Sequence, residues 1–266
     1  MADEAAWHWA TALGAWAIPD AILAAAPESP WSLPPALFAR SAERARAETS
    51  PSPSQQRARE ALPVGGEVID VGVGGGAASL PLAPPARCIV GVDQSDAMLA
   101  AFAEAAGRQG TGHAEVLGLW PDVAAGVEPA DVVVCHHVAY NVADLVPFAG
   151  ALAAAARRRV VLELTAEHPL TGTKALWQAL HGIERPSLPV AHDAVAVLEE
   201  MGLDVGVETF DRPSLWVGTD RAELVAFVRR RLCVGPERDA EIDALLAENS
   251  PDDVRHLVTV WWDTAG

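Results

Sequence analysis

The chain has 266 residues, and half of them are hydrophobic, so it is long enough to bury the core of one large α/β domain. Its 36 acidic and 19 basic residues give a formal net charge of −17. This balance argues against a nucleic-acid partner, because backbone phosphates require clustered Lys and Arg, and against docking on an anionic membrane. The acidic N-terminus and the lack of an eighteen-residue apolar run favour a cytoplasmic protein. The three cysteines are far apart and have no C-x-x-C spacing, so we expect no structural metal and no disulfide framework.

Residues 1–54 are expected to form a helical cap. Three tryptophans lie on an alanine-rich stretch that favours a helix ending near Pro19, and a second helix is expected over residues 36–48. The Ser-Pro run at residues 50–54 is typical of a turn or N-cap before a short helix over residues 55–62. The aromatic rings of the cap would either line an acceptor site or attach the cap to the rest of the protein, and the sequence leaves both open.

From residue 67 onward, short apolar runs rich in β-branched residues alternate with alanine-rich stretches. The strands expected are residues 68–71, 88–92, 115–117, 131–135, 160–164, 204–210 and 255–262. The helices expected are residues 77–83, 96–106, 142–157, 173–181, 193–201, 221–232 and 237–248. Continuous apolar strands separated by helices indicate a parallel sheet that is covered on both faces.

The strongest functional signal is the segment V-I-D-V-G-V-G-G-G-A-A at residues 68–78. Asp70 lies at the end of a predicted strand, and Gly72, Gly74 and Gly76 form the predicted turn into a helix. Glycines at such a turn let a ligand approach the backbone, and a following helix would offer free N–H groups. Asp93 ends the next strand, where a carboxylate can accept hydrogen bonds from both hydroxyls of a ribose.

Two cofactor classes fit this turn. Gly72, Gly74 and Ala77 match the G-x-G-x-x-A fingerprint for dinucleotide binding. The same segment also reads as D-x-G-x-G-x-G, with the Asp70 carboxylate two residues before the first glycine. A carboxylate at that place would repel a pyrophosphate but attract an ammonium group, so Asp70 favours a cofactor with a positively charged end.

The second pattern resembles motif I of the class I S-adenosylmethionine-dependent methyltransferases. The segments V-G-V-D-Q-S-D-A-M-L, at residues 90–99, and A-D-V-V-V-C-H-H-V-A-Y-N-V-A-D-L, at residues 130–145, resemble the second and fourth motifs of that family. The resemblance covers about residues 55–262. It implies an α/β, Rossmann-like fold: a seven-stranded, mostly parallel sheet with an antiparallel C-terminal strand, together with the N-terminal helical cap. The methyltransferase domain would be residues 55–266, with a helical insertion at about residues 220–250.

The resemblance also implies a cofactor site for S-adenosyl-L-methionine. Asp93 would hold the ribose, Met98 would lie near the adenine, and the loop after the third strand would hold the adenine ring. The cofactor-binding residues implied are Asp70, Gly72, Gly74, Gly76, Asp93, Gln94, Met98, Gly118, Leu119, Trp120 and His136.

Candidate groups for acid–base chemistry follow the fourth and fifth strands. His136 and His137 are adjacent at a strand end, so we expect their side chains to point to opposite sides, with His137 as the first choice for a base. His168 is the second choice, and Glu163 could orient it or bind a substrate amine. Tyr140 would either contact substrate or pack beneath the loop.

We therefore predict a methyltransferase that acts on oxygen or nitrogen of a small-molecule acceptor. The alternatives are a non-catalytic protein that binds the same cofactor and, less favoured, an NAD(P)-dependent oxidoreductase. The latter is disfavoured by Asp70 and by the absence of a Tyr-x-x-x-Lys pair. The sequence leaves open whether the protein is a monomer or a homodimer.

Overall fold

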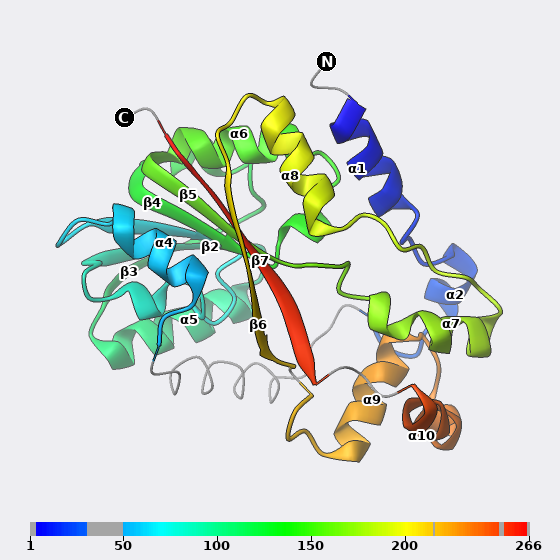
Figure 1. Ribbon diagram of the computed structural model, residues 1–266. Coiled ribbons are helices and arrows are strands. Elements are labelled where there is room, and N and C mark those ends of the chain that lie inside the picture. Colours follow the sequence, from blue (N-terminus) through cyan, green and yellow to red (C-terminus); the bar gives the residue numbers. More distant parts are fainter. Residues whose placement is uncertain (1–3, 31–49, 215, 250–252, 265–266) are drawn as a thin grey trace.

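The computed structural model describes residues 4–30, 50–214, 216–249 and 253–264. These residues form one seven-stranded sheet in the order β3-β2-β1-β4-β5-β7-β6 (Figure 1). The strands are β1 (Glu67–Val71), β2 (Cys88–Asp93), β3 (Gly112–Leu117), β4 (Ala130–His136), β5 (Ala156–Thr165), β6 (Gly206–Pro213) and β7 (Val254–Asp263). Every strand expected from the sequence is present, and the predicted fold class is confirmed.

The direction of the strands decides where a ligand can approach the sheet. Strand β7 is antiparallel to both of its neighbours, β5 and β6, whereas all other neighbouring pairs are parallel. The carboxyl ends of β1 to β6 therefore meet at one edge of the sheet. In open α/β sheets, ligands bind in the crevice outside this edge.

Helices cover both faces of the sheet (Figure 1). Helices α4 (Pro53–Ala61) and α5 (Asp96–Gln109) contribute Ala58 and Phe102 to a core that contains Val68 and Val132 of the central strands. Helices α1 (Glu4–Gly14), α6 (Leu145–Ala155) and α8 (Ala191–Glu200) pack on the other face. This two-sided burial explains why the central strands read as continuous apolar runs.

The N-terminal helix α1 is attached to the α6 and α8 face by a tryptophan. The Trp9 side chain is fully buried, and its indole Nε1–H donates a hydrogen bond of 2.8 Å to the carbonyl oxygen of Val142. Its ring stacks on that of Tyr140 at a centroid distance of 5.5 Å. The helix predicted over residues 36–48 lies outside the described residues.

Four further helices form a separate helical lobe, seen at the lower right of Figure 1. They are α2 (Asp20–Ala25), α7 (Lys174–His181), α9 (Arg221–Arg231) and α10 (Asp239–Glu248). Ile18, Trp177, Phe227 and Ile242 belong to the apolar cluster that these helices enclose. Helix α7 follows β5 in the chain, and α9 and α10 connect β6 with β7, so three helices of the lobe come from connections between the last strands and α2 comes from the N-terminal segment.

Two helix predictions are wrong. Residues 77–83 form turns and one 3₁₀ turn at Leu80–Leu82, because Pro81, Pro84 and Pro85 supply no N–H donors and Gly76 has a left-handed φ of 79°. The helix expected over residues 142–157 is shorter. Its last residues belong to β5, and Arg157–Arg159 lie at the start of that strand rather than at a helix end.

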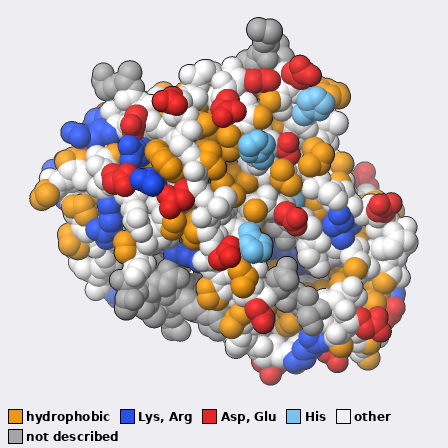
Figure 2. All heavy atoms as spheres, viewed as in Figure 1, with side chains coloured by type: hydrophobic (Ala, Val, Ile, Leu, Met, Phe, Trp, Pro, Cys, Tyr) orange, Lys and Arg blue, Asp and Glu red, His pale blue; other side chains and the backbone are white. Residues whose placement is uncertain are grey.

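Acidic side chains are spread over the face shown in Figure 2. None of the described helices combines the length and the apolar character needed to cross a bilayer.

Candidate active site

The glycine-rich turn after β1 is held in place by two backbone contacts to β2. The N–H groups of Gly72 and Val73 both donate to the carbonyl oxygen of Val92, at 2.8 and 3.1 Å. Gly72 has φ = 75°, and a Cβ atom there would lie 2.3 Å from Cγ2 of Val138. This position therefore requires glycine both for its backbone conformation and for its close contact with the chain that follows β4.

The middle of the same turn faces open space. A Cβ atom at Gly74 or Gly75 would meet no heavy atom within 4 Å. The N–H group of Gly74 donates to Oδ2 of Asp93 at 3.0 Å, and the N–H group of Ser95 donates to Oδ1 at the same distance. The turn and the Asp93 carboxylate thus form one bonded unit with room beside it for a ligand.

Asp70 lies beneath this turn and has no exposed surface. Ser79 Oγ donates a hydrogen bond of 2.6 Å to its Oδ2, while Oδ1 is buried and has no hydrogen-bond partner. Burial, with a smaller contribution from the Asp93 charge, raises the pKa of Asp70 to about 7, against the lowering effect of the Ser79 hydrogen bond. A buried carboxylate oxygen without a donor fits a ligand that brings an ammonium group, directly or through water.

The loop after β3 is attached to β2, since the N–H group of Gly118 donates to the carbonyl oxygen of Asp93 at 2.9 Å. Within this loop Leu119 is 55% exposed, whereas the Trp120 ring is buried in the core on the α6 face and its Nε1–H has no partner. Near the start of α5, Gln94 is exposed and Met98 is half-buried. The predicted cofactor residues of β1, β2 and the β3 loop thus gather along one stretch of the sheet edge.

A second group of polar side chains lies where β4 and β5 end. Nε2 of His137 is 3.2 Å from Oε1 of Glu163, and Nδ1 of His136 is 3.8 Å from Oε2. Ser54, in the first turn of α4, donates a hydrogen bond of 2.7 Å to Oε2 of Glu163. The hydroxyl oxygens of Ser54 and Thr259 are 2.6 Å apart. Four elements therefore converge on one buried carboxylate.

The expectation that the two histidines point to opposite sides is wrong, because both approach Glu163. His137 has φ = 61°, so the chain turns through a left-handed residue where the strand ends, and the alternation of side chains stops there. The side chain of His137 is 39% exposed, while that of His136 is largely buried. A left-handed, non-glycine residue beside a ligand crevice is a strained position of the kind found at functional sites.

The charges of this group follow from its burial. Burial lowers the pKa of His136 to about 4, so the ring is neutral at pH 7; Glu163 opposes this effect, and the charges of His137 and Arg212 add to it. Burial alone would raise the pKa of Glu163. The charge that His136 carries when it is protonated at low pH, together with the interactions of His137 and Ser54, outweighs burial and holds that pKa below its ordinary value. Glu163 is therefore an ionised carboxylate in a nearly closed environment.

His168 and Tyr140 lie together, apart from Glu163. The His168 ring stacks on Trp16 at a centroid distance of 3.9 Å and meets the Tyr140 ring edge-on at 5.2 Å. Tyr140 is buried, and its hydroxyl donates to the carbonyl oxygen of Thr165 at 3.0 Å. In the described part of the chain, His168 shares no hydrogen bond with His137 or Glu163; its Nδ1 accepts from the Leu170 N–H.

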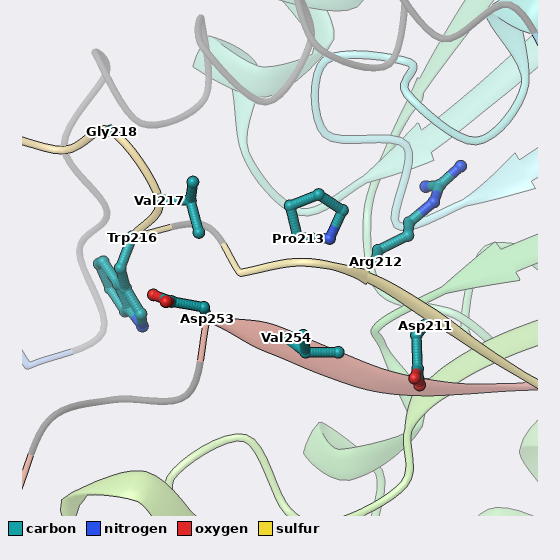
Figure 3. A pocket seen from close by; sticks show the side chains of 8 residues that line it. All are labelled: Asp211, Arg212, Pro213, Trp216, Val217, Gly218, Asp253 and Val254. Atoms are coloured by element: carbon teal, nitrogen blue, oxygen red, sulfur yellow. The ribbon is translucent and has the colours of Figure 1, made fainter.

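A cavity of about 550 Å³ opens where β6 ends and β7 begins. In Figure 3 the side chains of Trp216 and Asp253 lie close together beside Val217, and Arg212, which also lines the cavity, lies farther along β6. The charge of Arg212 also lowers the pKa of His136.

Reasoning from the sequence missed the roles of Ser54 and Thr259 and the pairing of Glu163 with His137. The carboxylate at the end of β5 was a usable signal, because β5 lies next to β4 and His136 is in register with Glu163. The serine and the threonine carried no such signal, since they are 109 and 96 residues away from Glu163 along the chain. Only the packing of α4 and β7 on β5 brings them together.

Comparisons with known proteins agree with this geometry. Residues 69–161, from β1 into β5, match the family model described as "Methyltransferase domain". The fold is similar to that of the YcgJ protein from Bacillus subtilis, with 15% identity, a TM-score of 0.55, and 80% of this chain and 98% of that one covered. It is also similar to an S-adenosylmethionine-dependent methyltransferase from Thiobacillus denitrificans in complex with S-adenosyl-L-homocysteine, with 20% identity, a TM-score of 0.50 and coverages of 87% and 99%. The [4+2]-cyclase SpnF has the same fold, with 13% identity, a TM-score of 0.52 and 80% of each chain covered. A search of curated protein sequences gives no significant match.

The sheet order and the motif-bearing turn define a Rossmann-like fold of the methyltransferase type. The family model matches residues 69–161, about a third of the chain, and this part of the sheet is therefore similar to a methyltransferase domain. The match supports S-adenosyl-L-methionine, the cofactor that the sequence motifs predict.

Proposed function

We propose that this protein is a class I S-adenosylmethionine-dependent methyltransferase that transfers the methyl group to an oxygen or nitrogen atom of a small-molecule acceptor, and that His137 acts as the base. The observation that carries the proposal is the placement of His137. Its partly exposed imidazole lies at the carboxyl end of β4, beside a buried carboxylate. Acceptor hydroxyl and amine groups carry a proton that must leave when the methyl group is transferred, and an imidazole is suited to receive it near neutral pH.

The residues of β1, β2 and the β3 loop would hold the cofactor. Asp70 would meet the ammonium group, Gly74 and Gly75 would leave room for close approach, and Asp93 would accept hydrogen bonds from the ribose. Gln94, Met98, Gly118, Leu119, Trp120 and His136 would complete the surroundings of the cofactor, together with Gly72 and Gly76 of the turn. Bound S-adenosyl-L-methionine supplies an electrophilic methyl group on a positively charged sulfur atom.

His137 would act on the acceptor and not on the cofactor. An acceptor O–H or N–H hydrogen-bonded to the imidazole loses its proton to the free ring nitrogen as its lone pair forms the new bond to carbon. Positioned proton transfer of this kind typically accelerates a reaction by about 10²–10⁴-fold. The side chain of His137 is 39% exposed, so an acceptor can reach its ring.

The cavity at the ends of β6 and β7 supports an acceptor of small-molecule size. Its volume of about 550 Å³ lies within the usual range for ligand pockets, about 300–1,000 Å³. Trp216, Val217 and Pro213 offer apolar surface, and Asp253 offers a carboxylate. Such a lining suits a partly apolar molecule that carries a hydroxyl or amine group.

The first experiment is calorimetric titration of the purified protein with S-adenosyl-L-homocysteine, with NADH in parallel. Binding of the first ligand alone is expected, and it would justify a screen of phenols, alcohols and amines for methyl transfer. For an acceptor found in this way, His137→Gln should lower kcat by about 10²-fold or more with little change in cofactor affinity. His192→Gln, which changes an exposed histidine in the first turn of α8, serves as the control.

Three outcomes would contradict the proposal. Binding of NADH alone would contradict the cofactor assignment. Methylation of carbon acceptors only would contradict the assignment of the acceptor atom. An unchanged kcat in His137→Gln would contradict the assignment of the base.

A further inference from the structure

We propose that Glu163 is a positioning residue that holds His137 with its proton on Nε2, so that Nδ1 is the nitrogen free to take a proton. This inference rests on the proposed role of His137 and extends it by naming the working nitrogen and the group that selects it. The geometry that carries it is the 3.2 Å distance between Nε2 of His137 and Oε1 of Glu163.

The charge of Glu163 decides which of the two groups carries the hydrogen in this 3.2 Å contact. An ionised carboxylate has no hydrogen to donate, so the hydrogen between the two groups belongs to the imidazole. In a neutral imidazole with Nε2–H, the lone pair is on Nδ1. Glu163 therefore selects one of the two tautomers of His137.

The other oxygen of Glu163 is held by a chain of two hydroxyl groups. Ser54 has one hydroxyl hydrogen, and it is directed to Oε2 of Glu163 at 2.7 Å. The Thr259 hydroxyl must then be the donor in its 2.6 Å contact with Ser54. Thr259 is fully buried, and Glu163 is only 2% exposed, so no water competes for these positions.

Helix α4 adds to the stability of the negative charge. Ser54 lies in the first turn of this nine-residue helix, whose N-terminus is closed by a capping box between Ser52 and Gln55. The N-terminal turn of the helix therefore lies beside the Glu163 carboxylate, and a negative charge is favoured near a helix N-terminus. This is the physical reason why a carboxylate can stay ionised in so closed a place.

His136 does not compete with His137 for the carboxylate. Its Nδ1 is 3.8 Å from Oε2, beyond hydrogen-bond distance, and its ring is neutral at pH 7. The charge of Arg212, on β6, also lowers the pKa of His136 and so disfavours a second positive charge there. His137 is therefore the only one of the two histidines within 3.2 Å of the Glu163 carboxylate, at Oε1.

The backbone of His137 is attached to the same residue as its ring. Its N–H group donates to the carbonyl oxygen of Glu163 at 2.7 Å. The backbone of His137 is bonded to the carbonyl oxygen of Glu163 and its ring is in contact with the carboxylate of the same residue, so His137 is held at two points. A base that is fixed in this way needs no reorganisation before it meets an acceptor.

The tautomer can be measured without any turnover. The chain has eight histidines, and ¹⁵N spectra of the labelled protein with and without His137→Gln would assign its ring. The expected result is a ring with protonated Nε2 and unprotonated Nδ1 at pH 8. In Glu163→Gln the carboxylate charge is lost, so the ring should show a mixture of the two tautomers.

Kinetics provides the second readout once an acceptor is known. Glu163→Gln should lower kcat by roughly tenfold or more with little change in the KM of the acceptor, and shift the acid limb of the pH profile to lower pH. Ser54→Ala should have the same effects to a smaller extent, and it keeps the test open if Glu163→Gln fails to fold. Glu167→Gln, at an exposed carboxylate four residues later, is the matched control.

A ring protonated on Nδ1 in the wild-type protein would overturn the inference. Spectra of His137 that do not change in Glu163→Gln or, if that variant is unfolded, in Ser54→Ala would also overturn it. If the spectra are as expected but no acceptor is methylated, the proposed function fails while the positioning by Glu163 stands. The two failures are therefore distinguishable.

Discussion

Ser79 donates a hydrogen bond of 2.6 Å to the carboxyl group of Asp70, which has no exposed surface. Among the described residues, Ser79 is the only side-chain hydrogen-bond partner of this carboxyl group. Asp70 lies at the end of β1, below the glycine turn, and burial raises its pKa to about 7. At neutral pH the group is thus close to half ionised before any ligand binds. An ammonium group arriving at Oδ1 would complete its ionisation and its hydrogen bonding together.

The first prediction concerns the stability cost of the buried Asp70 charge. The folded-state pKa is raised above the ordinary value of 3.8, so the folded protein binds the extra proton between about pH 4 and 7. This contribution to stability is present below pH 4 and is lost as the pH rises to 7, at about 1.4 kcal/mol per pH unit. Asp70→Asn cannot ionise, so its unfolding free energy relative to wild type should rise from pH 5 to pH 8 by a few kcal/mol.

Urea denaturation of both proteins at pH 5, 6, 7 and 8 would test this prediction. Ser79→Ala is the companion variant, because removal of the hydroxyl donor should raise the pKa of Asp70 further. If the unfolding free energies of wild type and Asp70→Asn change with pH in the same way over the whole range, the pKa of Asp70 is not raised in the folded protein.

The second prediction separates two roles of glycine in the turn. Gly72→Ala would place a Cβ atom 2.3 Å from Val138 Cγ2 and force a left-handed alanine, so it should destabilise the fold by about 2 kcal/mol or more. Gly75→Ala meets no atom within 4 Å, so its unfolding free energy should stay within about 0.5 kcal/mol of wild type. Its affinity for S-adenosyl-L-homocysteine should nevertheless fall about tenfold, because the new methyl group occupies space beside the cofactor. Thermal unfolding and calorimetry measure the two effects; equal affinities in wild type and Gly75→Ala would show that the open side of the turn is not the cofactor side.

The central strands β1 and β4 were predictable because each is an apolar run that is buried on both faces. The sequence wrongly predicted a helix over residues 77–83, after the glycine-rich turn. These residues have a helical composition, and only the prolines around residue 84 indicate that a helix cannot form there. The pairing of His137 with Glu163 depends on a left-handed φ at a histidine, a conformation that a sequence pattern does not encode. Local chemistry could therefore be read from the motifs, whereas contacts between distant segments required the fold.

The third prediction concerns acid stability and His168. Burial, with a smaller effect of the Arg185 charge, lowers the pKa of His168 to about 4, below the ordinary value of 6.5. Between these two values the unfolded chain binds the proton more readily, so stability is full above pH 6.5 and falls toward pH 4, by up to about 1.4 kcal/mol per pH unit for this group. His168→Gln loses the stacking on Trp16 and should be less stable at pH 7, but its stability should fall less steeply between pH 6.5 and 4.5. Guanidinium denaturation at several pH values gives both slopes, and an equal slope in the variant would contradict the buried, neutral state of His168.

The fourth prediction concerns Asp93, for which we propose a second function beside its contacts in the turn. Its carboxylate accepts the N–H groups of Gly74 and Ser95 and so fixes the turn, and the same oxygens have lone pairs left for ribose hydroxyls. Asp93→Asn keeps the shape but replaces one acceptor by a donor, so it should weaken binding of S-adenosyl-L-homocysteine by about 2 kcal/mol, or roughly thirtyfold. Asp96→Asn, at an exposed aspartate in the first turn of α5, should leave the affinity unchanged. Amide hydrogen exchange at Gly74 separates the two functions of Asp93. If exchange becomes faster in Asp93→Asn while the affinity for the cofactor product stays at the wild-type value, the carboxylate fixes the turn and does not hold the ribose.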